Sequence, residues 1–150
     1  MKEITMRPVG VIRSPFKTTG DVPIQPVFAG GAEGTVEVFD EFAEGLEGLE
    51  GFSHIILVYH FHLSKGFSLR VKPYLDETPR GVFATRAPRR PNPVGLSVVR
   101  LVGVEGGTLR VIDIDVVDGT PLLDIKPHVP EFDSSGPGRV GWLEGKIDRM

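Results

Sequence analysis

The chain has 150 residues, of which 40% are hydrophobic, and its formal net charge is -3 at pH 7. This length and composition suit one domain with a hydrophobic core, and no segment approaches the roughly 18 consecutive apolar residues of a membrane-spanning helix. Because the chain has no Cys, disulfides, thiolate nucleophiles and Cys-bound metal centres are excluded. The first residues lack the apolar core of a signal peptide, so we expect a cytoplasmic protein without membrane association.

The composition is typical of a mainly β fold. Gly and Pro are frequent, with 19 and 13 residues, and the apolar residues form short β-branched runs between turn signals. In chain order, the patterns predict strands at 9–13, 35–39, 54–63, 67–73, 81–85, 97–104, 109–117 and 122–125. Asp40 could cap a short helix that reaches Glu50, but three glycines make this stretch more turn-like than helical. No boundary divides the chain, so residues 1–150 are expected to form a single domain.

The segment 54–63, HIILVYHFHL, has the strongest strand pattern. Its alternate residues share two faces, and both look largely buried, as in a barrel or a covered sheet. His60 and His62 lie on one face and could chelate a metal, but no third ligand is nearby, so we expect no metal site. A hydrogen bond in the core suits His60, and contact with a ligand at the strand's exit suits His62.

The stretch 84–97, ATRAPRRPNPVGLS, has the features of an anion-binding loop. Between residues 78 and 104 the chain carries five Arg and no Asp, Glu or Lys. The planar guanidinium group binds carboxylate and phosphate in a fixed orientation, and three prolines stiffen the loop. Gly95 permits a close approach that a side chain would forbid. The alternative is a surface connection with merely solvated arginines, which the single sign of charge and the stiffness disfavour.

Familiar nucleotide motifs are absent. The GxGxxG pattern at 136–141 has too few residues after it for the helix and strand of a dinucleotide-binding unit, and neither a P-loop nor a GxSxG elbow occurs. The DGTP stretch at 118–121 predicts either a plain turn or a turn whose Asp and Thr side chains, beside free backbone amides, hold a polar ligand. Near the end of the chain, Trp142 and Leu143 could dock the glycine-rich tail.

Five stretches, in this order along the chain, together resemble the TsaA-like or TrmO family of tRNA methyltransferases. They are GVIRSPF at 10–16, VPIQP at 22–26, GFSHIILVYHFH at 51–62, GVFATRAPRRPNPVGLS at 81–97 and DGTPLLDIKPHVP at 118–130. The resemblance implies a single small β-barrel with short helical and loop insertions, without a Rossmann fold. It also implies a homodimer that binds S-adenosylmethionine and methylates N6 of threonylcarbamoyladenosine, next to the anticodon in the tRNA anticodon loop.

The resemblance also assigns cofactor-binding residues. Those implied to contact S-adenosylmethionine are Pro23, Ile24, Gln25, His62, Leu63, Arg90, Leu101, Val117, Asp118, Gly119 and Thr120.

Methyl transfer from a sulfonium needs a well-placed acceptor, exclusion of water and a group that takes the proton of the acceptor. Asn92 and Asp124 are the candidates for the last role, with Lys126 orienting the substrate. Arg86 and Arg89 would hold RNA phosphate or the threonyl carboxylate of the modified base. Two alternatives stay open: a non-catalytic module that binds S-adenosylmethionine or a nucleotide, and a methyltransferase that acts on another small acceptor.

Overall fold

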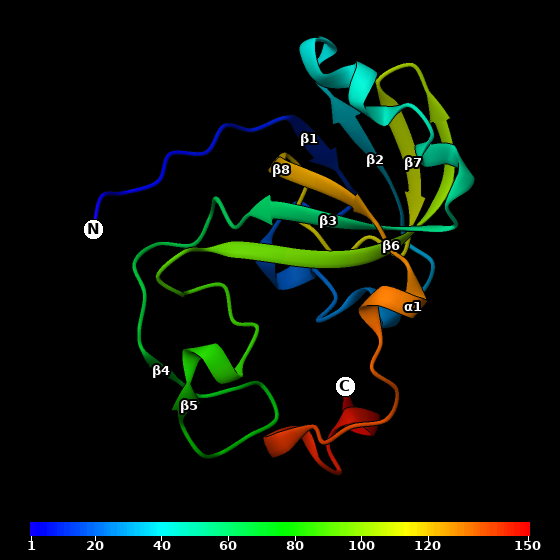
Figure 1. Ribbon diagram of the computed structural model, residues 1–150. Coiled ribbons are helices and arrows are strands. Elements are labelled where there is room, and N and C mark those ends of the chain that lie inside the picture. Colours follow the sequence, from blue (N-terminus) through cyan, green and yellow to red (C-terminus); the bar gives the residue numbers. More distant parts are fainter.

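The predicted β-barrel is present. The computed structural model describes residues 1–150 and contains a closed barrel of antiparallel strands in the order β1-β2-β7-β6-β3-β8, with no Rossmann arrangement (Figure 1). The barrel strands are β1 Gly10–Arg13, β2 Glu33–Val38, β3 His54–His60, β6 Val94–Glu105, β7 Thr108–Ile112 and β8 Thr120–Pro127. Two further strands, β4 Arg70–Val71 and β5 Arg80–Gly81, pair outside the barrel.

Short helices fill the connections between the strands. The only α-helix is α1 Pro130–Asp133, and the 3-10 helices are η1 Thr19–Asp21, η2 Pro26–Phe28, η3 Asp40–Leu46, η4 Leu49–Gly51, η5 Val82–Ala84, η6 Gly141–Leu143 and η7 Ile147–Arg149. In the stretch after Asp40, Gly48 adopts a φ of 87° and separates η3 from η4, so the glycines do prevent a continuous helix. None of the helices has the length and apolar character needed to span a membrane.

The alternation predicted for the long central strand sets the barrel core. Ile55, Leu57 and Tyr59 of β3 point inward and are buried, whereas the residues between them are only partly buried. The strand ends at His60 and not at Leu63, because the amide of His62 donates to the carbonyl of His60 and turns the chain. The outer face is therefore less enclosed than the sequence suggested.

Several predicted strands have different bounds. The strands expected at 67–73 and 81–85 shrink to the two-residue β4 and β5, and residues 82–84 form η5 instead. The strand expected at 109–117 ends at Ile112, because Asp113 adopts a φ of 74° and its carboxylate accepts a hydrogen bond from the amide of Gly31 (3.1 Å). By contrast, β8 runs through Pro127, which is tolerated at a strand end where its missing N–H breaks no ladder bond.

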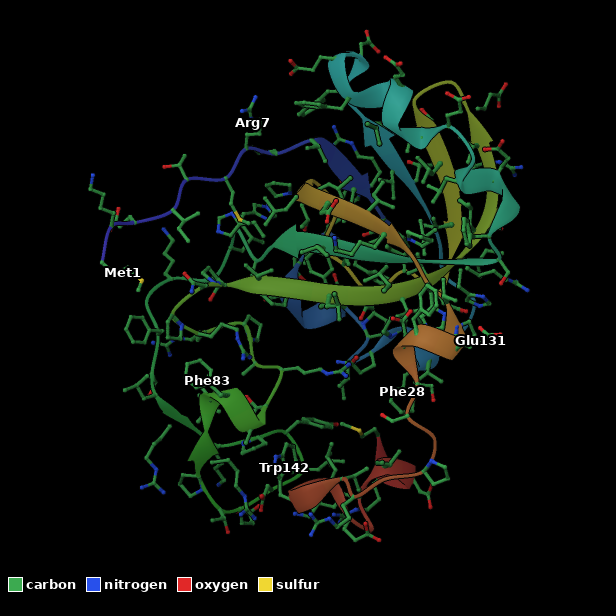
Figure 2. All side chains as sticks on the ribbon, in the orientation of Figure 1. Met1, Arg7, Phe28, Phe83, Glu131 and Trp142 are labelled. Carbon is green, nitrogen blue, oxygen red and sulfur yellow. The ribbon has the colours of Figure 1, made fainter.

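Residues 61–93, which connect β3 to β6, form a lobe beside the barrel together with the C-terminal tail (Figure 1). The indole Nε1 of Trp142 donates to the carbonyl of Ala84 (2.7 Å), which confirms the predicted docking anchor (Figure 2). Asp76 bonds Arg80 (2.6 Å) and pairs with Lys146 (3.3 Å). The pKa of Asp76 is lowered to about 2, mainly by the hydrogen bond from Arg80, so this carboxylate is charged at neutral pH. Its pairing with Lys146 therefore ties the C-terminal tail to the lobe.

Gly95 permits the predicted close approach. A Cβ at this position of β6 would lie 2.3 Å from a ring carbon of Tyr59 and 2.7 Å from the ring of Phe61. These two rings pack edge to face with centroids 5.4 Å apart, so neither can move aside without disturbing the other. The contact fixes the position of both rings against β6.

We expect Gly95→Ala to destabilise the protein by about 1–3 kcal/mol, because the added methyl group overpacks a buried contact. Chemical denaturation measures the change in free energy of unfolding. Gly81→Ala is the matched control, because φ at Gly81 is -60° and nothing lies within 4 Å of the point that a Cβ would occupy there. Equal stability of the two variants would show that the Tyr59 ring does not depend on the glycine.

Candidate functional site

A hydrogen bond joins two of the segments predicted to bind ligands. Arg86 Nη1 donates to Gln25 Oε1 (2.6 Å), across 61 residues of sequence. Gln25 is partly buried and directly precedes η2, and Pro23 and Ile24 lie in the loop before it. A predicted substrate residue and a predicted cofactor residue are therefore neighbours.

Arg90 binds its own loop. Its Nη1 donates to the carbonyls of Thr85 (2.9 Å) and Ala87 (3.1 Å), and its side chain is partly buried. Arg89 and Asn92 are exposed, and neither side chain makes a hydrogen bond within the protein. The proline-rich loop is thus held from inside by Arg90, which leaves Arg89 and Asn92 accessible to a partner.

The exit of β3 lies against the same loop. The amide of Phe61 donates to the carbonyl of Pro93 (2.8 Å), which places His62 and Leu63 beside the end of the proline-rich stretch. His62 is partly buried and Leu63 is 50% exposed. Two segments that the resemblance assigned to one cofactor therefore meet, although they lie far apart in the sequence.

The turn 117–120 does not have the free backbone amides of a ligand-binding turn, one of the two forms predicted for it. The amides of Asp118, Gly119 and Thr120 donate to the carbonyls of Phe16, Ile12 and Val117, so none is free to bind a ligand. The Asp118 carboxylate accepts from the Ser14 amide (3.0 Å) and from Lys17 Nζ (3.0 Å), and the Lys17 hydrogen bond is the main cause of its lowered pKa. The visible role of this turn is to fasten β8 to the end of β1.

Three further predicted site residues, Asp124, Lys126 and Leu101, lie apart from the Gln25–Arg86 contact. Asp124 and Lys126 form an ion pair (2.9 Å) on the outer surface of β8, with side chains 49% and 65% exposed. They pair in register with Val58 and Ile56, whose side chains also face outward from β3. Leu101 packs against the barrel core. No hydrogen bond links these three residues to the Gln25–Arg86 contact.

An open hollow of about 400 Å³ lies between β1, β2 and β7, apart from that contact. Of the predicted site residues it contains only Asp118, whose charge is paired with Lys17. We therefore place the candidate site at the proline-rich loop and not in this hollow.

A buried polar chain next to Arg86 was not predicted from the sequence. Tyr59 Oη and Ser97 Oγ lie 2.7 Å apart, and Ser97 Oγ donates to Asp115 Oδ1 (2.5 Å). Tyr59 and Ser97 are 4% and 1% exposed. The one signal in the sequence is Ser97, a polar residue between the inward-facing Gly95 and Val99, whereas Asp115 fell within the strand expected at 109–117, which in fact ends earlier.

Burial raises the pKa of Asp115 to about 6, although the hydrogen bond from Ser97 and the positive charge of Arg86 both act to lower it. Burial likewise raises the pKa of the Tyr59 phenol, with a further contribution from Asp115. The carboxyl group of Asp115 can therefore exchange a proton near neutral pH, while Tyr59 stays protonated. Because the charge of Arg86 acts on Asp115 and Arg86 also bonds Gln25, we include this carboxyl group in the candidate site.

The barrel and its proline-rich loop are shared with known proteins. A family model described as the tRNA-methyltransferase O N-terminal domain matches residues 11–134. The chain belongs to the TrmO family. Its barrel and the lobe that carries the proline-rich loop both lie within the matched residues, apart from the docked tail.

Three relatives illustrate the similarity. A probable S-adenosyl-L-methionine-binding protein of Pyrococcus abyssi is 60% identical over 147 residues, which are 98% of this chain and 80% of the relative. The tRNA (adenine(37)-N6)-methyltransferase of Homo sapiens is 38% identical over 134 residues, 85% of this chain and 30% of that protein. The crystal structure of TrmO from Pseudomonas aeruginosa superimposes with a TM-score of 0.80 at 45% identity, over 93% of this chain and 62% of that one.

The internal bonds of Arg90 should protect the proline-rich loop from local opening. Arg90→Ala removes two hydrogen bonds to loop carbonyls, so the amides of residues 85–92 should exchange with solvent about 10-fold faster or more, since each lost bond costs about 0.5–1.5 kcal/mol. Hydrogen exchange measured by mass spectrometry tests this. Arg89→Ala is the matched control, with the same loss of charge one residue away and no expected change. Similar exchange in both variants would rule out the internal role of Arg90.

Proposed function

We propose that this chain is an S-adenosylmethionine-dependent methyltransferase that acts on N6 of threonylcarbamoyladenosine, next to the anticodon of tRNA. Membership of the TrmO family supports this reaction. The observation that carries the proposal is the Gln25–Arg86 hydrogen bond, because it joins the segment expected to hold the cofactor to the loop expected to hold the RNA. Transfer requires donor and acceptor to lie at near-attack distance, and contact between the two segments expected to hold them favours this placement.

The residues around this contact fit the chemistry of the cofactor. S-adenosylmethionine supplies an activated methyl group on a positively charged sulfur, and it also carries a carboxylate, an ammonium group and an adenine ring. Gln25, whose Oε1 accepts from Arg86, still has its amide Nε2 to donate to the carboxylate. Ile24 and Leu63, which are 38% and 50% exposed, offer apolar surface for a flat ring. We propose that Pro23, His62 and Arg90, which lie in the segments that meet here, complete this site, whereas the cofactor roles named by the resemblance for Leu101 and residues 117–120 stay predictions.

The lobe that carries the proline-rich loop suits a single-stranded RNA loop. Residues 61–93 hold seven Lys and Arg against two acidic residues, a net charge of +5 in a chain of net charge -3. Phe67, Tyr74 and Phe83 on this lobe are 54%, 75% and 77% exposed. Of these, Phe83 is labelled in Figure 2. Basic groups bind phosphate and exposed aromatic rings stack on bases, which is how proteins recognise unpaired nucleotides. This composition supports the anticodon loop as the partner.

We further propose that the protein acts in the cytoplasm as a homodimer. Val94 and Leu96 of β6 are 39% and 53% exposed on the outer face of the barrel, and apolar side chains in this position suit contact with a second copy. The pair of Asp124 and Lys126 on the neighbouring outer face could then meet a substrate that spans two subunits, which is the setting in which their predicted roles would apply.

Methyl transfer is tested directly with methyl-labelled S-adenosylmethionine and threonylcarbamoylated tRNA. We expect label in the modified nucleoside, identified by digestion and mass spectrometry. The same tRNA without the threonylcarbamoyl group is the control and should remain unlabelled. If the protein binds the cofactor in a calorimeter but transfers no label, it is a binding module, and label on a small molecule instead of RNA would indicate another acceptor.

Arg89→Ala should weaken tRNA binding and lower the slope of log K against log salt by about 0.7, the value expected for one contact with single-stranded phosphate. Binding measured at several salt concentrations by fluorescence anisotropy gives this slope. Arg7→Ala removes the same charge from the N-terminal segment, on another side of the molecule (Figure 2), and should leave the slope unchanged. An unaltered slope in Arg89→Ala would remove the phosphate-binding role.

A further inference from the structure

Asp115 lies at the meeting point of the barrel core and the candidate site. It follows β7 in the segment that Asp113 turns with its positive φ, and its carboxylate ends the chain of hydrogen bonds from Tyr59 of β3 through Ser97 of β6. Ser97 donates to Oδ1 (2.5 Å), and no other side chain bonds the carboxylate, so Oδ2 has no side-chain donor. Asp115 is partly buried.

The charged and titratable groups that face Asp115 come from two elements. Tyr59 approaches from β3, and Arg86 approaches from the proline-rich loop, where it also holds Gln25. Ser97 from β6 is the neutral hydroxyl between Asp115 and Tyr59. The carboxylate thus has one oxygen without a side-chain donor, and it feels the charge of Arg86, the residue that joins the proposed RNA-binding loop to Gln25.

We infer that Asp115 accepts the proton of the nitrogen that becomes methylated, an inference that rests on the proposed function. The nitrogen forms a bond to the methyl carbon, and the carbon–sulfur bond breaks with its electron pair staying on sulfur. The proton of that nitrogen moves to Asp115 Oδ2, while the N–H electron pair stays on nitrogen. The Ser97 hydrogen bond holds the other carboxylate oxygen in place during the transfer.

Asp115 suits this role better than the two candidates named from the sequence. Asn92 carries a neutral amide, which is a poor proton acceptor at neutral pH. Asp124 lies on the outer face of the barrel, and Lys126 holds its carboxylate (2.9 Å). Asp115 is also the only Asp in the protein whose pKa is clearly raised, and a value of about 6 leaves it ionised at pH 7 yet able to take up a proton.

The first test is Asp115→Asn, which keeps the shape of the side chain and can still accept from Ser97. We expect the rate of methyl transfer to fall by about 10²–10⁴-fold, the range for loss of a general base, while affinities for S-adenosylmethionine and tRNA remain within about 2-fold. The matched control is Asp113→Asn. Asn tolerates the φ of 74° at that position and can still accept from the Gly31 amide, so its rate should equal that of the wild type.

The second test is the pH dependence of kcat/KM. Only the ionised carboxylate accepts the proton, so the rate should rise with pH and level off above about 6. The Ser97 hydrogen bond lowers the pKa of Asp115, so in Ser97→Ala the rise of kcat/KM should move to higher pH. The rate at high pH should also fall, because the bond that holds the carboxylate is lost. If Asp115 had a purely structural role, the pH dependence of kcat/KM would be the same in Ser97→Ala and in the wild type.

The third test needs neither cofactor nor RNA. The folded protein holds the Asp115 proton more tightly than the unfolded chain, because the pKa is raised from 3.8 to about 6. Wild-type stability should therefore fall as the pH rises from about 4 to 6, and the charged form should remain unfavourable above that range. Asp115→Asn removes this cost, so it should have a higher Tm than the wild type at pH 7.5 and no such advantage at pH 4.

The outcomes separate the inference from the proposed function. An active wild type together with an Asp115→Asn variant that retains a tenth or more of its rate would overturn the role of Asp115 and leave the methyltransferase standing. A lower Tm of Asp115→Asn at pH 7.5 would overturn it as well, because it would make the carboxylate a structural support. A wild type that binds both ligands without transferring a methyl group would reject the function and the inference together.

Discussion

The contact between the Tyr59 ring and the backbone of Gly95 is the constraint on which the candidate site depends. Because β6 has no side chain at that point, the ring packs closely against the strand and its hydroxyl reaches Ser97, two residues further along the same inward face. Ser97 in turn orients Asp115. The barrel interior of tightly packed apolar residues therefore holds one polar chain, whose last member, Asp115, feels the charge of Arg86. The rigidity of the core is passed to this carboxylate.

The arginines of the loop divide into three roles because their surroundings differ. Arg90 is turned inward to the carbonyls of its own loop, Arg86 reaches across to Gln25, and Arg89 makes no hydrogen bond within the protein. A loop stiffened both by prolines and by its own guanidinium group loses little entropy when a ligand binds. Internal bonding of Arg90 is compatible with a role near the cofactor, since a guanidinium group has five donors and one nitrogen makes both bonds seen here.

The sequence allowed the barrel and the loop to be predicted, because their signals are local: alternation in β3, prolines and arginines in series, and a glycine where a ring must lie. The rest depends on long-range contacts. Asp118 is bonded to Ser14 and Lys17 across more than 100 residues, so its turn looked like a ligand site when taken alone. Asp115 was missed because nothing in the apolar run around it shows that Asp113 ends the strand by a positive φ, which residue types permit but do not require.

The energetics of Asp115 favour the chemical role inferred for it. As a hydrogen-bond acceptor for Ser97, an Asn in the same position would serve equally well and would avoid the cost of an ionised group in a partly buried place. Asp118 and Asp76, which hold the structure together, have lowered pKa values because Lys and Arg side chains bond them. Asp115 has the opposite environment: burial dominates, and the nearest positive charge is shared with Gln25. A carboxylate kept at an energetic disadvantage beside an accessible loop is typical of a group that exchanges protons with a substrate, since a merely structural acidic residue gains stability from its partners.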